Sequence, residues 1–440
     1  MRWTLQTVAS AVSGSAVGEA PVDRVVVDSR EARPGALFVA LRGERHDGHE
    51  FAPEAAAAGA AVVAEAGRIP PGSPGVEVPD TLEALRAMAV WRRSELDARV
   101  VAVTGSTGKT TTKDLIAAAL GPGTHAAPRS FNNEVGVPLT VLGAPDAARR
   151  LVIEAGSRGR GHIALLAPAV RPDVAVITTI GAAHLEMFGS LAAVREAKWE
   201  LVEALHPGGT AVLPSDDPLL TRRRRGALLT FGRSGADVAL AGETLDEFGR
   251  AAFTLRHDGR EVPVRMSTAG RHQAVNAAAA VAAAIAAGVP FDDAAARVAD
   301  ARLSPWRMEV HPGRVTVVND AYNANPASMA SALETVAAMP GRHLAVLGMM
   351  RELGAAEAAA HREVGEAARR LGFAAVVVVG DDPGIAEGAG PIAHRAAGRS
   401  EALEVLAGLI RDGDVVLVKA SRAVGLEELA RSLVEEVVPA

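Results

Sequence analysis

One short segment of the chain has the residue types that bind nucleotide phosphates. Thr104–Thr110 reads Thr-Gly-Ser-Thr-Gly-Lys-Thr and directly follows the apolar run Val100–Val103, which predicts a strand, and a helical pattern follows it. In such a loop, backbone N–H groups point at phosphate oxygens, the lysine reaches the β- and γ-phosphates, and the threonine hydroxyl binds Mg²⁺. The strict pattern is not met, because Val103 stands where its first glycine belongs. We predict that the loop and the start of the helix bind ATP through Gly105, Ser106, Thr107, Gly108, Lys109, Thr110 and Thr111.

Two further residues follow predicted strands and carry side chains that can bind a metal. Glu154 ends the apolar run Leu151–Ile153, and His184 comes shortly after the predicted strand Asp173–Thr178. The carboxyl ends of parallel strands line the nucleotide crevice of an open α/β sheet, and carboxylate oxygens suit a hard cation. Taken alone, Glu154 fits a solvated turn residue equally well, and a single histidine is more often a core or surface residue than a ligand.

The rarity of some residue types gives a second way to find functional positions. The chain has one tyrosine, six asparagines and four lysines, namely Lys109, Lys113, Lys198 and Lys419. A GC-rich genome or adaptation to heat removes these residue types from positions that tolerate replacement. The lysines and asparagines that remain are therefore enriched at positions that arginine or aspartate cannot fill. This argument raises the functional weight of Lys198, which would otherwise be interpreted as a solvated helical lysine.

The densest group of rare residues lies in the last third of the sequence. Asn319–Asn325 contains Tyr322 and half of the asparagines, and Pro326 follows it. Asparagine and aspartate at the end of a strand are suited to hydrogen bonds with ribose or peptide groups, and an Asn-Pro pair predicts a turn before the next helix. A purely structural turn does not need this set of residues, so we predict a binding function for the segment.

Composition excludes several classes of protein. The net charge is −6 and the isoelectric point is about 6.1, so the chain has no positive field for a nucleic acid or an anionic membrane. The absence of cysteine removes disulfides, thiolate catalysis and cysteine-ligated metals, and fits a reducing compartment. Met1–Ala20 lacks the apolar core of a signal peptide, and Ala274–Gly288 is too short and too alanine-rich to cross a bilayer. The sequence predicts a soluble, cytoplasmic protein without nucleic-acid or membrane partners.

The elements that must position these residues follow a pattern typical of α/β proteins. A chain of 440 residues with 49% hydrophobic and 22% charged residues is expected to form about three domains. The first eighty residues predict strands at 24–28, 36–41 and 60–64 and a helix at 51–58, ahead of the Pro/Gly-rich stretch 69–75. The last third predicts strands at 315–319, 343–347, 374–379 and 414–418 and helices at 327–338, 355–371, 401–410 and 425–436. Strands that alternate with helices in this way predict a parallel, doubly wound sheet.

Taken together, these segments resemble the Mur ligases of peptidoglycan synthesis over nearly the whole chain, and within that family the branch that adds D-alanyl-D-alanine. The resemblance is carried by Asp28–Arg30, Asp47–His49 with Phe51, Thr104–Thr110, Asn132–Pro138, Glu154, Ala183–Glu186, Ala197–Lys198, Gly270–His272 with Asn276, and Tyr322–Pro326. Tyr322–Pro326 discriminates best, because the neighbouring MurE branch typically has an Ala-His-Thr-Pro type of sequence there. The Asp-Asn-Pro-Arg motif of that branch is also missing.

The resemblance implies an α/β fold of three domains. These are a UDP-substrate-binding domain at 1–80, a central P-loop ATPase with a parallel sheet at 81–307, and a C-terminal Rossmann-like ligase domain at 308–440. It implies an ATP-dependent amide ligase that joins D-alanyl-D-alanine to a UDP-N-acetylmuramoyl-tripeptide through an acyl phosphate. The expected protein is a cytoplasmic monomer. The third residue of the tripeptide (diaminopimelate, lysine or ornithine) stays open.

The resemblance also implies roles for individual residues. It implies ATP and two Mg²⁺ ions as cofactors, with Thr110, Glu154 and His184 as metal ligands. It assigns catalysis to Lys109, His184 and Lys198, with a carbamate on Lys198 as the modification that would turn this cation into a metal-binding anion. Further ATP contacts are expected from Asn276, Arg307 and Asp320. Substrate contacts are expected from Ser29, Arg30, Asn132, Asn133, Tyr322, Asn323 and Asn325.

Two positions in the third domain depart from the family pattern. Met349 stands for the usual aspartate in Gly348–Gly354, and Ala420 stands for the usual glycine in Val418–Arg422. These departures leave open a nucleotide-binding partner without catalysis, although the intact Lys109 counts against it. Within the ligases, a MurE-type enzyme and a folylpolyglutamate synthase are the alternatives.

Overall fold

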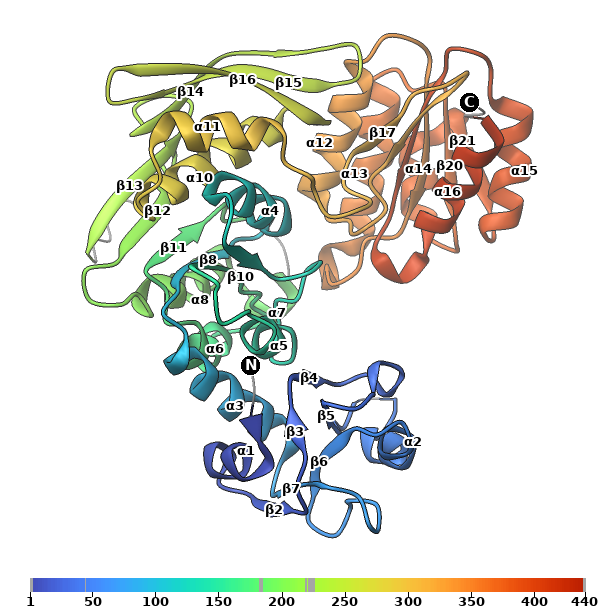
Figure 1. Cartoon of the computed structure of the whole chain (residues 1–440). Helices are drawn as coiled ribbons and strands as arrows, with labels where there is room; N and C mark the ends of the chain where they lie inside the picture. The colour runs from blue at the N-terminus through green and yellow to red at the C-terminus, as the bar shows by residue number, and fades with distance from the viewer. Residues whose placement is uncertain (1–2, 44, 182–184, 218–219, 221–225, 438–440) are drawn as a thin grey trace.

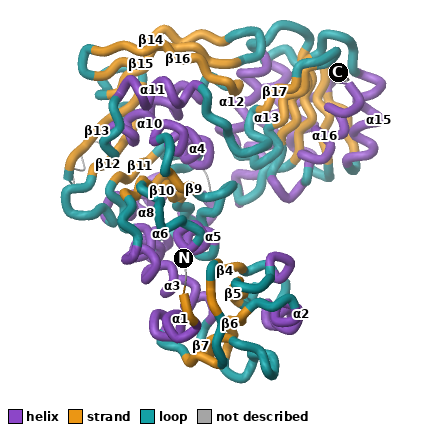
Figure 2. Tube along the Cα trace, viewed as in Figure 1, coloured by secondary structure: helices purple, strands orange, loops and turns teal. Residues whose placement is uncertain are grey.

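The computed structural model describes residues 3–43, 45–181, 185–217, 220 and 226–437. Three large sheets follow one another along the chain, and Figure 1 shows the N-terminal one at the bottom, the central one at the left and the C-terminal one at the upper right. The mixture of helices and largely parallel strands confirms the predicted α/β class (Figure 2). No helix in the described parts of the chain combines the length and apolarity needed to span a membrane.

The N-terminal sheet is small and mostly parallel. Its strands lie in the order β2 (Ser15–Val17), β7 (Gly75–Val78), β6 (Ala61–Glu65), β5 (Ala36–Val39) and β4 (Arg24–Val26), and only β2 is antiparallel. The helices are α1 (Leu5–Val12) and α2 (Ala52–Ala57), and β1 (Trp3–Thr4) pairs separately with β3 (Pro21–Val22). The three strands and the helix predicted here from apolar runs are all present.

The central sheet has nine strands and carries the predicted phosphate loop. Its order is β16-β15-β14-β13-β12-β11-β8-β10-β9, and it is parallel from β9 to β14. The parallel strands before β14 are β8 (Arg99–Thr104), β9 (Thr124–Ala126), β10 (Arg150–Glu154), β11 (Val174–Ile177), β12 (Thr210–Pro214) and β13 (Ala227–Gly232). The helices are α3 (Thr81–Glu95), α4 (Lys109–Leu120), α5 (Gly136–Leu142), α6 (His162–Val170), α7 (Leu185–Phe188), α8 (Leu191–Glu203), α10 (His272–Ala286) and α11 (Phe291–Ala299).

Three long strands, antiparallel to one another, extend this sheet at one edge, and the sequence did not predict them. They are β14 (Val238–Leu245), β15 (Arg250–His257) and β16 (Arg260–Ala269). The apolar faces of this extension and of α4 pack on α10, whose alanines are almost all buried. The alanine-rich segment is thus a core helix, which small side chains allow to approach its neighbours closely.

The C-terminal sheet has the order β17-β18-β22-β19-β20-β21 and is parallel except for β17. Its strands are β17 (Glu309–His311), β18 (Thr316–Asn319), β19 (His343–Gly348), β20 (Ala375–Val379), β21 (Ala393–Ala396) and β22 (Val415–Lys419). The helices are α12 (Pro326–Ala337), α13 (Glu357–Arg370), α14 (Pro383–Ala389), α15 (Arg399–Leu409) and α16 (Leu426–Val437). Two separate apolar clusters cover the two faces of the sheet, which makes it the predicted doubly wound unit.

Helix α3 connects the first two units. It begins at Thr81 because the Asp80 carboxylate accepts hydrogen bonds from the N–H groups of Leu82 and Glu83 at 2.8 and 2.9 Å. Its inner face buries Leu85 and Met88 in a cluster that includes residues of both the N-terminal and the central sheet. Each such side chain stabilises the contact by about 1.5–3 kcal/mol.

Candidate functional site

The phosphate loop lies at the carboxyl end of β8 and leads directly into α4. Two of its glycines have conformations that other residues avoid, with φ of 155° at Gly105 and 77° at Gly108. A Cβ atom at Gly105 would collide with the hydroxyl of Thr178. Gly108 is the N-cap of α4, so the free N–H groups of the first turn face the loop. The strand–loop–helix arrangement predicted from the sequence is therefore present.

Two threonines after β11 hold this loop in place. The Thr178 hydroxyl donates to the Thr107 carbonyl at 2.6 Å, and the Thr179 hydroxyl accepts from the Thr107 N–H at 3.2 Å. The Ser106 N–H donates to the Thr179 carbonyl at 2.9 Å. Sequence analysis missed both threonines, because their partners are more than 70 residues away in the chain.

Lys109 folds back over the loop that it follows. Its ammonium donates to the Gly105 carbonyl at 2.8 Å and to the Ser106 carbonyl at 3.4 Å. Burial lowers the pKa of Lys109, the charge of Glu154 raises it, and the charge of Arg307 lowers it. A poorly solvated cation beside free N–H groups attracts phosphate strongly, because an anion there would supply the charge partner that water does not.

Glu154 has one carboxylate oxygen in use and one free. Its Oε1 accepts from the Asn132 side-chain amide at 2.7 Å, whereas Oε2 is buried and has no hydrogen-bond partner among the described residues. The side chain is only 1% exposed. A buried carboxylate oxygen without a donor suits a cation. Thr110, on the first turn of α4, is also buried, so both predicted oxygen ligands in the described chain fit a Mg²⁺ site.

Lys198 is buried on the inner face of α8, 2% exposed. Burial lowers the pKa of Lys198 well below its usual range, and the charge of Lys109 lowers it further. No carboxylate pairs with this ammonium among the described residues. The solvated helical lysine considered at first is therefore excluded. His184, the third predicted ligand, lies outside the described residues.

Residues of the C-terminal domain meet the central domain at Arg307. The guanidinium of Arg307 stacks on the Tyr322 ring, with 4.1 Å from its central carbon to the ring centroid. The Tyr322 hydroxyl contacts the hydroxyl of Ser130, which lies in the loop after β9. Burial raises the pKa of Tyr322. Tyr322, singled out by its rarity, is thus a domain-interface residue, and Ser130 is a partner that the sequence did not reveal.

Asp320 and Asn323 are held by a lysine from the neighbouring strand. Lys419 Nζ donates to Asp320 Oδ2 at 2.6 Å and to the Asn323 carbonyl at 2.9 Å. The other oxygen of Asp320 accepts from the Met308 N–H at 3.1 Å. Lys419 lies at the end of β22, which pairs with β18, so the two strand ends place these groups together. The rarity of lysine pointed to this position, but no role was assigned to it.

The remaining predicted asparagines have different surroundings. Asn276 lies beside the phosphate loop, because its Oδ1 would be 2.8 Å from a Cβ atom on Gly108. Asn133 accepts through its side chain from the N–H of Gly136 at 2.8 Å at the start of α5. Asn325 is the N-cap of α12 and forms a reciprocal capping box with Ser328. Asn133 and Asn325 therefore have local structural functions as well as their predicted substrate roles.

Ser29 and Arg30 are not part of this group. They lie in the N-terminal unit, where Arg30 Nε donates to Asp28 Oδ1 at 2.8 Å and the Ser29 hydroxyl donates to Glu54 at 3.4 Å. The Arg30 side chain is 84% exposed. The charge and hydrogen bonds of Arg30 lower the pKa of Asp28 to about 2. The predicted UDP-side residues thus lie in the N-terminal unit, and the Arg30 side chain is open to solvent.

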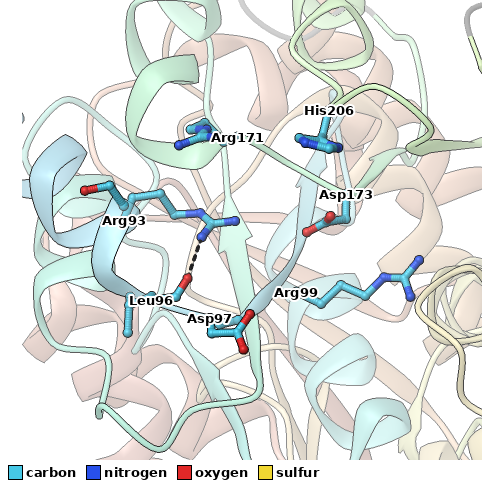
Figure 3. A pocket seen from close by; sticks show the side chains of 9 residues that line it. Arg93, Leu96, Asp97, Arg99, Arg171, Asp173 and His206 are labelled. Carbon is cyan, nitrogen blue, oxygen red and sulfur yellow. Dashed lines mark hydrogen bonds between the residues drawn. The ribbon is translucent and has the colours of Figure 1, made fainter.

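A charged cavity lies at the opposite end of the central sheet from the phosphate loop (Figure 3). It measures about 440 Å³ and is lined by residues that precede β8, β11 and β12. Three of its charged groups bond to the backbone: Arg93 donates to the Leu96 carbonyl at 3.0 Å, Arg99 donates to the Ala286 carbonyl at 3.0 Å, and Asp173 accepts from the Val100 N–H at 2.7 Å. These bonds hold the amino ends of the strands, so we do not assign a substrate to this cavity.

A second group of metal-ligating residue types lies in the C-terminal domain. Ligand atoms of Glu357, His361 and Asp382 lie within 4.8 Å of one another. His361 Nε2 accepts from the Met350 N–H at 2.8 Å, so the ring proton must be on Nδ1, the nitrogen that faces Asp382. A protonated nitrogen cannot bind a metal. We therefore do not assign a metal to this group; His361 instead holds the loop after β19 through the Met350 N–H.

Comparison with known sequences identifies the domains. The sequence model of the Mur ligase middle domain matches residues 103–284. The sequence model of the Mur ligase glutamate ligase domain matches residues 306–422, and the model of the Mur ligase family catalytic domain matches residues 21–90. The UDP-N-acetylmuramoyl-tripeptide–D-alanyl-D-alanine ligase of Mycobacterium tuberculosis is 37% identical over 98% of both chains. The ligase of the same name from Escherichia coli is 34% identical, again over 98% of both chains.

Solved structures resemble the whole chain as well. The crystal structure of MurF from Acinetobacter baumannii superposes with a TM-score of 0.90 at 30% identity, covering 99% of both chains. The structure of MurF from Thermotoga maritima in complex with ADP superposes with a TM-score of 0.83 at 32% identity, covering 94% of this chain and 98% of that one. The three-domain α/β fold is thus shared over the full length.

Proposed function

The chain belongs to the Mur ligase family, and we propose that it joins D-alanyl-D-alanine to a UDP-N-acetylmuramoyl-tripeptide, converting ATP to ADP and phosphate. One structural observation carries the proposal. Arg307 stacks on Tyr322 of the C-terminal domain, and its charge lowers the pKa of Lys109 in the phosphate loop of the central domain. A ligase needs such a junction, because it must bring an activated acid and an amine together.

The reaction needs activation because the oxygen of a carboxylate is a poor leaving group. The tripeptide carboxylate attacks the γ-phosphorus of ATP, which forms an acyl phosphate and releases ADP. The amine of D-alanyl-D-alanine then attacks the acyl carbon, an amide bond forms, and phosphate and a proton leave. Lys109 and the N–H groups of the loop bind the phosphates and neutralise the charge that develops on them.

The residues around Glu154 fit a divalent cation. We propose that Thr110, Glu154 and His184 hold Mg²⁺ and that the site takes two ions, with the free Oε2 of Glu154 as the supporting observation. When bound, Mg²⁺ supplies positive charge against the phosphate oxygens. Asn132 orients the Glu154 carboxylate through its amide and leaves Oε2 for the cation.

Lys198 is proposed to act as a carbamate. Burial favours the uncharged form of the Lys198 amine, and an uncharged amine reacts with CO₂ to give a carbamate and a proton. The product is an anion, which can face a cation site, whereas an ammonium would repel it. Arginine cannot undergo this reaction, which agrees with the survival of a lysine at this position.

Substrate contacts are proposed from all three domains. Ser29 and Arg30 would bind the uridine nucleotide, and Asn276, Arg307 and Asp320 would contact ATP. The proposed peptide-binding residues are Asn132, Asn133, Tyr322, Asn323 and Asn325. We keep the domain boundaries at 80/81, where Asp80 caps α3, and at 307/308, between Arg307 and β17. A cytoplasmic monomer completes the proposal.

The test is the mass of the product. The purified chain is incubated with ATP, Mg²⁺, UDP-N-acetylmuramoyl-tripeptide and D-alanyl-D-alanine, and the expected product is heavier than the acid by one dipeptide less one water. Parallel reactions replace the dipeptide by diaminopimelate, lysine or glutamate. Product formation with a single amino acid but not with the dipeptide would show a MurE-type or folylpolyglutamate-type enzyme. Nucleotide binding without any phosphate release would show a non-catalytic partner.

A further inference from the structure

Lys113 is a buried lysine that the proposed reaction does not use. It lies on α4, one turn after Lys109, and is 1% exposed. Its ammonium donates to the carbonyls of Ala127 and Arg129 at 2.7 and 2.6 Å and lies 2.9 Å from Asp114 Oδ1. Two of its three N–H donors bond to these carbonyls, and the Asp114 carboxylate balances its charge. A planar guanidinium cannot match this arrangement, which explains why lysine persists here in an arginine-rich chain.

The two carbonyls belong to the loop after β9, which reaches the C-terminal domain. The next residue of that loop, Ser130, contacts the hydroxyl of Tyr322. Arg129 has a φ of 55°, which is a strained, left-handed conformation for a residue with a side chain. A residue keeps such a conformation only where its surroundings hold it. Lys113 holds the loop at this strained residue, directly beside the contact between the domains.

Asp114 holds the chain segment that links the central and C-terminal domains. Its Oδ2 accepts from the Ser304 N–H at 2.7 Å. Two residues further on, the Trp306 carbonyl accepts from the Tyr322 N–H at 3.2 Å. Trp306 and Met308 have φ values of 62° and 51°, so this linker also contains strained residues. Asp114 therefore fixes the start of a linker that leads to the same tyrosine.

We propose that Lys113 and Asp114 are positioning residues that couple the phosphate loop to the orientation of the C-terminal domain. This rests on the proposed function in taking a nucleotide as the ligand of the loop. Both residues lie on α4, whose first turn begins at the loop, so a shift of α4 on phosphate binding moves the loop after β9 and the linker together. Both segments contact Tyr322. Lys113 and Asp114 thereby transmit nucleotide binding to the domain that must present the amine.

The alternative is a buried ion pair that only stabilises the fold, and the chain contains a matched control of that kind. Arg342 donates to Asp414 at 2.7 and 3.0 Å, and Asp414 is 2% exposed. All of the hydrogen bonds to the Asp414 carboxylate come from the C-terminal domain among the described residues. Asp414→Asn therefore perturbs a buried carboxylate, paired with an arginine that is 32% exposed, without touching the junction.

The experiment measures domain orientation separately from nucleotide affinity. The chain has no cysteine, so Ser234→Cys in the central domain and Ser400→Cys on α15, both exposed, give a defined pair of dye sites in the full chain. Energy transfer between the dyes is followed as ADP and Mg²⁺ are added, and calorimetry gives the ADP affinity. The variants are Asp114→Ala, which removes the acceptor of the Ser304 N–H, Asp114→Asn, which keeps an acceptor oxygen, and Asp414→Asn.

We expect ADP to change the energy transfer in the parent chain and in Asp414→Asn. In Asp114→Ala the ADP affinity should stay within about threefold, while the change in transfer at saturating ADP falls by at least about half. In Asp114→Asn the change in energy transfer should lie between that of the parent chain and that of Asp114→Ala. This variant provides the test if Asp114→Ala does not fold. A parent-like response in both Asp114 variants would overturn the coupling, as would a parent chain that binds ADP without a change in transfer. Absence of ADP binding by the parent chain would instead overturn the proposed function together with the coupling.

Discussion

The phosphate loop and the Asp28–Arg30 segment both bear charged groups predicted to bind substrate, but they differ in their contact with water. At the phosphate loop, Lys109 and Lys198 are poorly solvated and both pKa values are lowered by burial. At the N-terminal segment, hydrogen bonding with Asp28 raises the pKa of Arg30, whose side chain lies almost wholly in solvent. Among the described residues, neither lysine of the first site forms an ion pair, whereas Arg30 of the second site is paired with Asp28.

This difference predicts how each site responds to a lost charge. A group in a poorly solvated site acts through a low effective dielectric constant, so its removal changes the energy of a bound anion strongly. An exposed pair is screened by water and typically contributes about 0–1 kcal/mol. The exposed arginine gains importance only when the substrate itself excludes water. Mutations should therefore affect turnover most at the central site and substrate affinity most at the N-terminal site.

The largest effect is expected for Lys109→Ala. The variant loses the ammonium that faces the transferring phosphate, so kcat should fall by about 100- to 1000-fold. The fold should persist, because this ammonium bonds only to two carbonyls of its own loop among the described residues. Phosphate release is measured together with the circular dichroism spectrum. A folded variant with normal phosphate release would show that the loop does not serve the reaction.

Substitutions of Lys198 test whether this side chain acts as a buried anion or as a buried cation. If the carbamate is the active form, Lys198→Ala should lose about 10- to 100-fold in activity, and short carboxylic acids in the buffer should restore part of it. Lys198→Arg should not recover the lost activity, because a guanidinium stays cationic and cannot form a carbamate. Phosphate release is measured with and without acetate or formate. Near-normal activity of the arginine variant would reject the carbamate.

Arg30→Ala tests the exposed site. The Arg30 guanidinium is exposed to solvent, so a nucleotide can reach it, and its loss should raise KM for the UDP-substrate by about tenfold. KM for ATP should change by less than about twofold, since Arg30 lies in the separate N-terminal unit. Initial rates are measured with each substrate varied in turn. An effect confined to ATP, or equal for both substrates, would mean that the N-terminal domain has a different function.

The sequence predicted best those features that depend on near neighbours. The strand–loop–helix around Gly105 and the strands flanking it arise from apolar runs and local turn chemistry, and they lie where predicted. The rarity of lysine marked Lys113, Lys198 and Lys419, and all three are buried. That filter works because a buried ammonium needs specific oxygens or a specific reaction, whereas a surface cation is replaced by arginine without loss.

Features that depend on distant partners could not be predicted. Thr178 holds the phosphate loop through a bond that spans 71 residues, and Ser130 meets Tyr322 across 192 residues. Neither residue type is unusual, so only the folded chain reveals its function. The edge strands β14–β16 were missed for a related reason. Their half-exposed sides break the apolar runs that make buried parallel strands recognisable.

The smallest effect, and the most specific test of an exposed pair, is expected for Asp28→Asn. Asp28 Oδ1 accepts from the Arg30 N–H at 3.0 Å, and asparagine can still accept this bond but loses the charge. Exchange of the amide hydrogens over residues 28–32 should therefore quicken by at most about fivefold near pH 6, the ratio that ~1 kcal/mol allows.

The direction of the pH dependence follows from the pKa of Asp28, which is lowered from 3.8 to about 2 in the folded chain. A lowered pKa stabilises the folded segment above pH 4, and this stabilisation is lost as the pH falls toward 2. The difference between the parent chain and the variant should thus be complete at pH 6 and smaller at pH 3. Mass spectrometry at matched pH cancels the intrinsic exchange rates, and a peptide from β6 reports any general unfolding in acid. A difference that grows toward pH 3 would contradict the ion pair, and a difference much larger than fivefold would show that this segment, like the phosphate loop, depends on a charge that water does not screen.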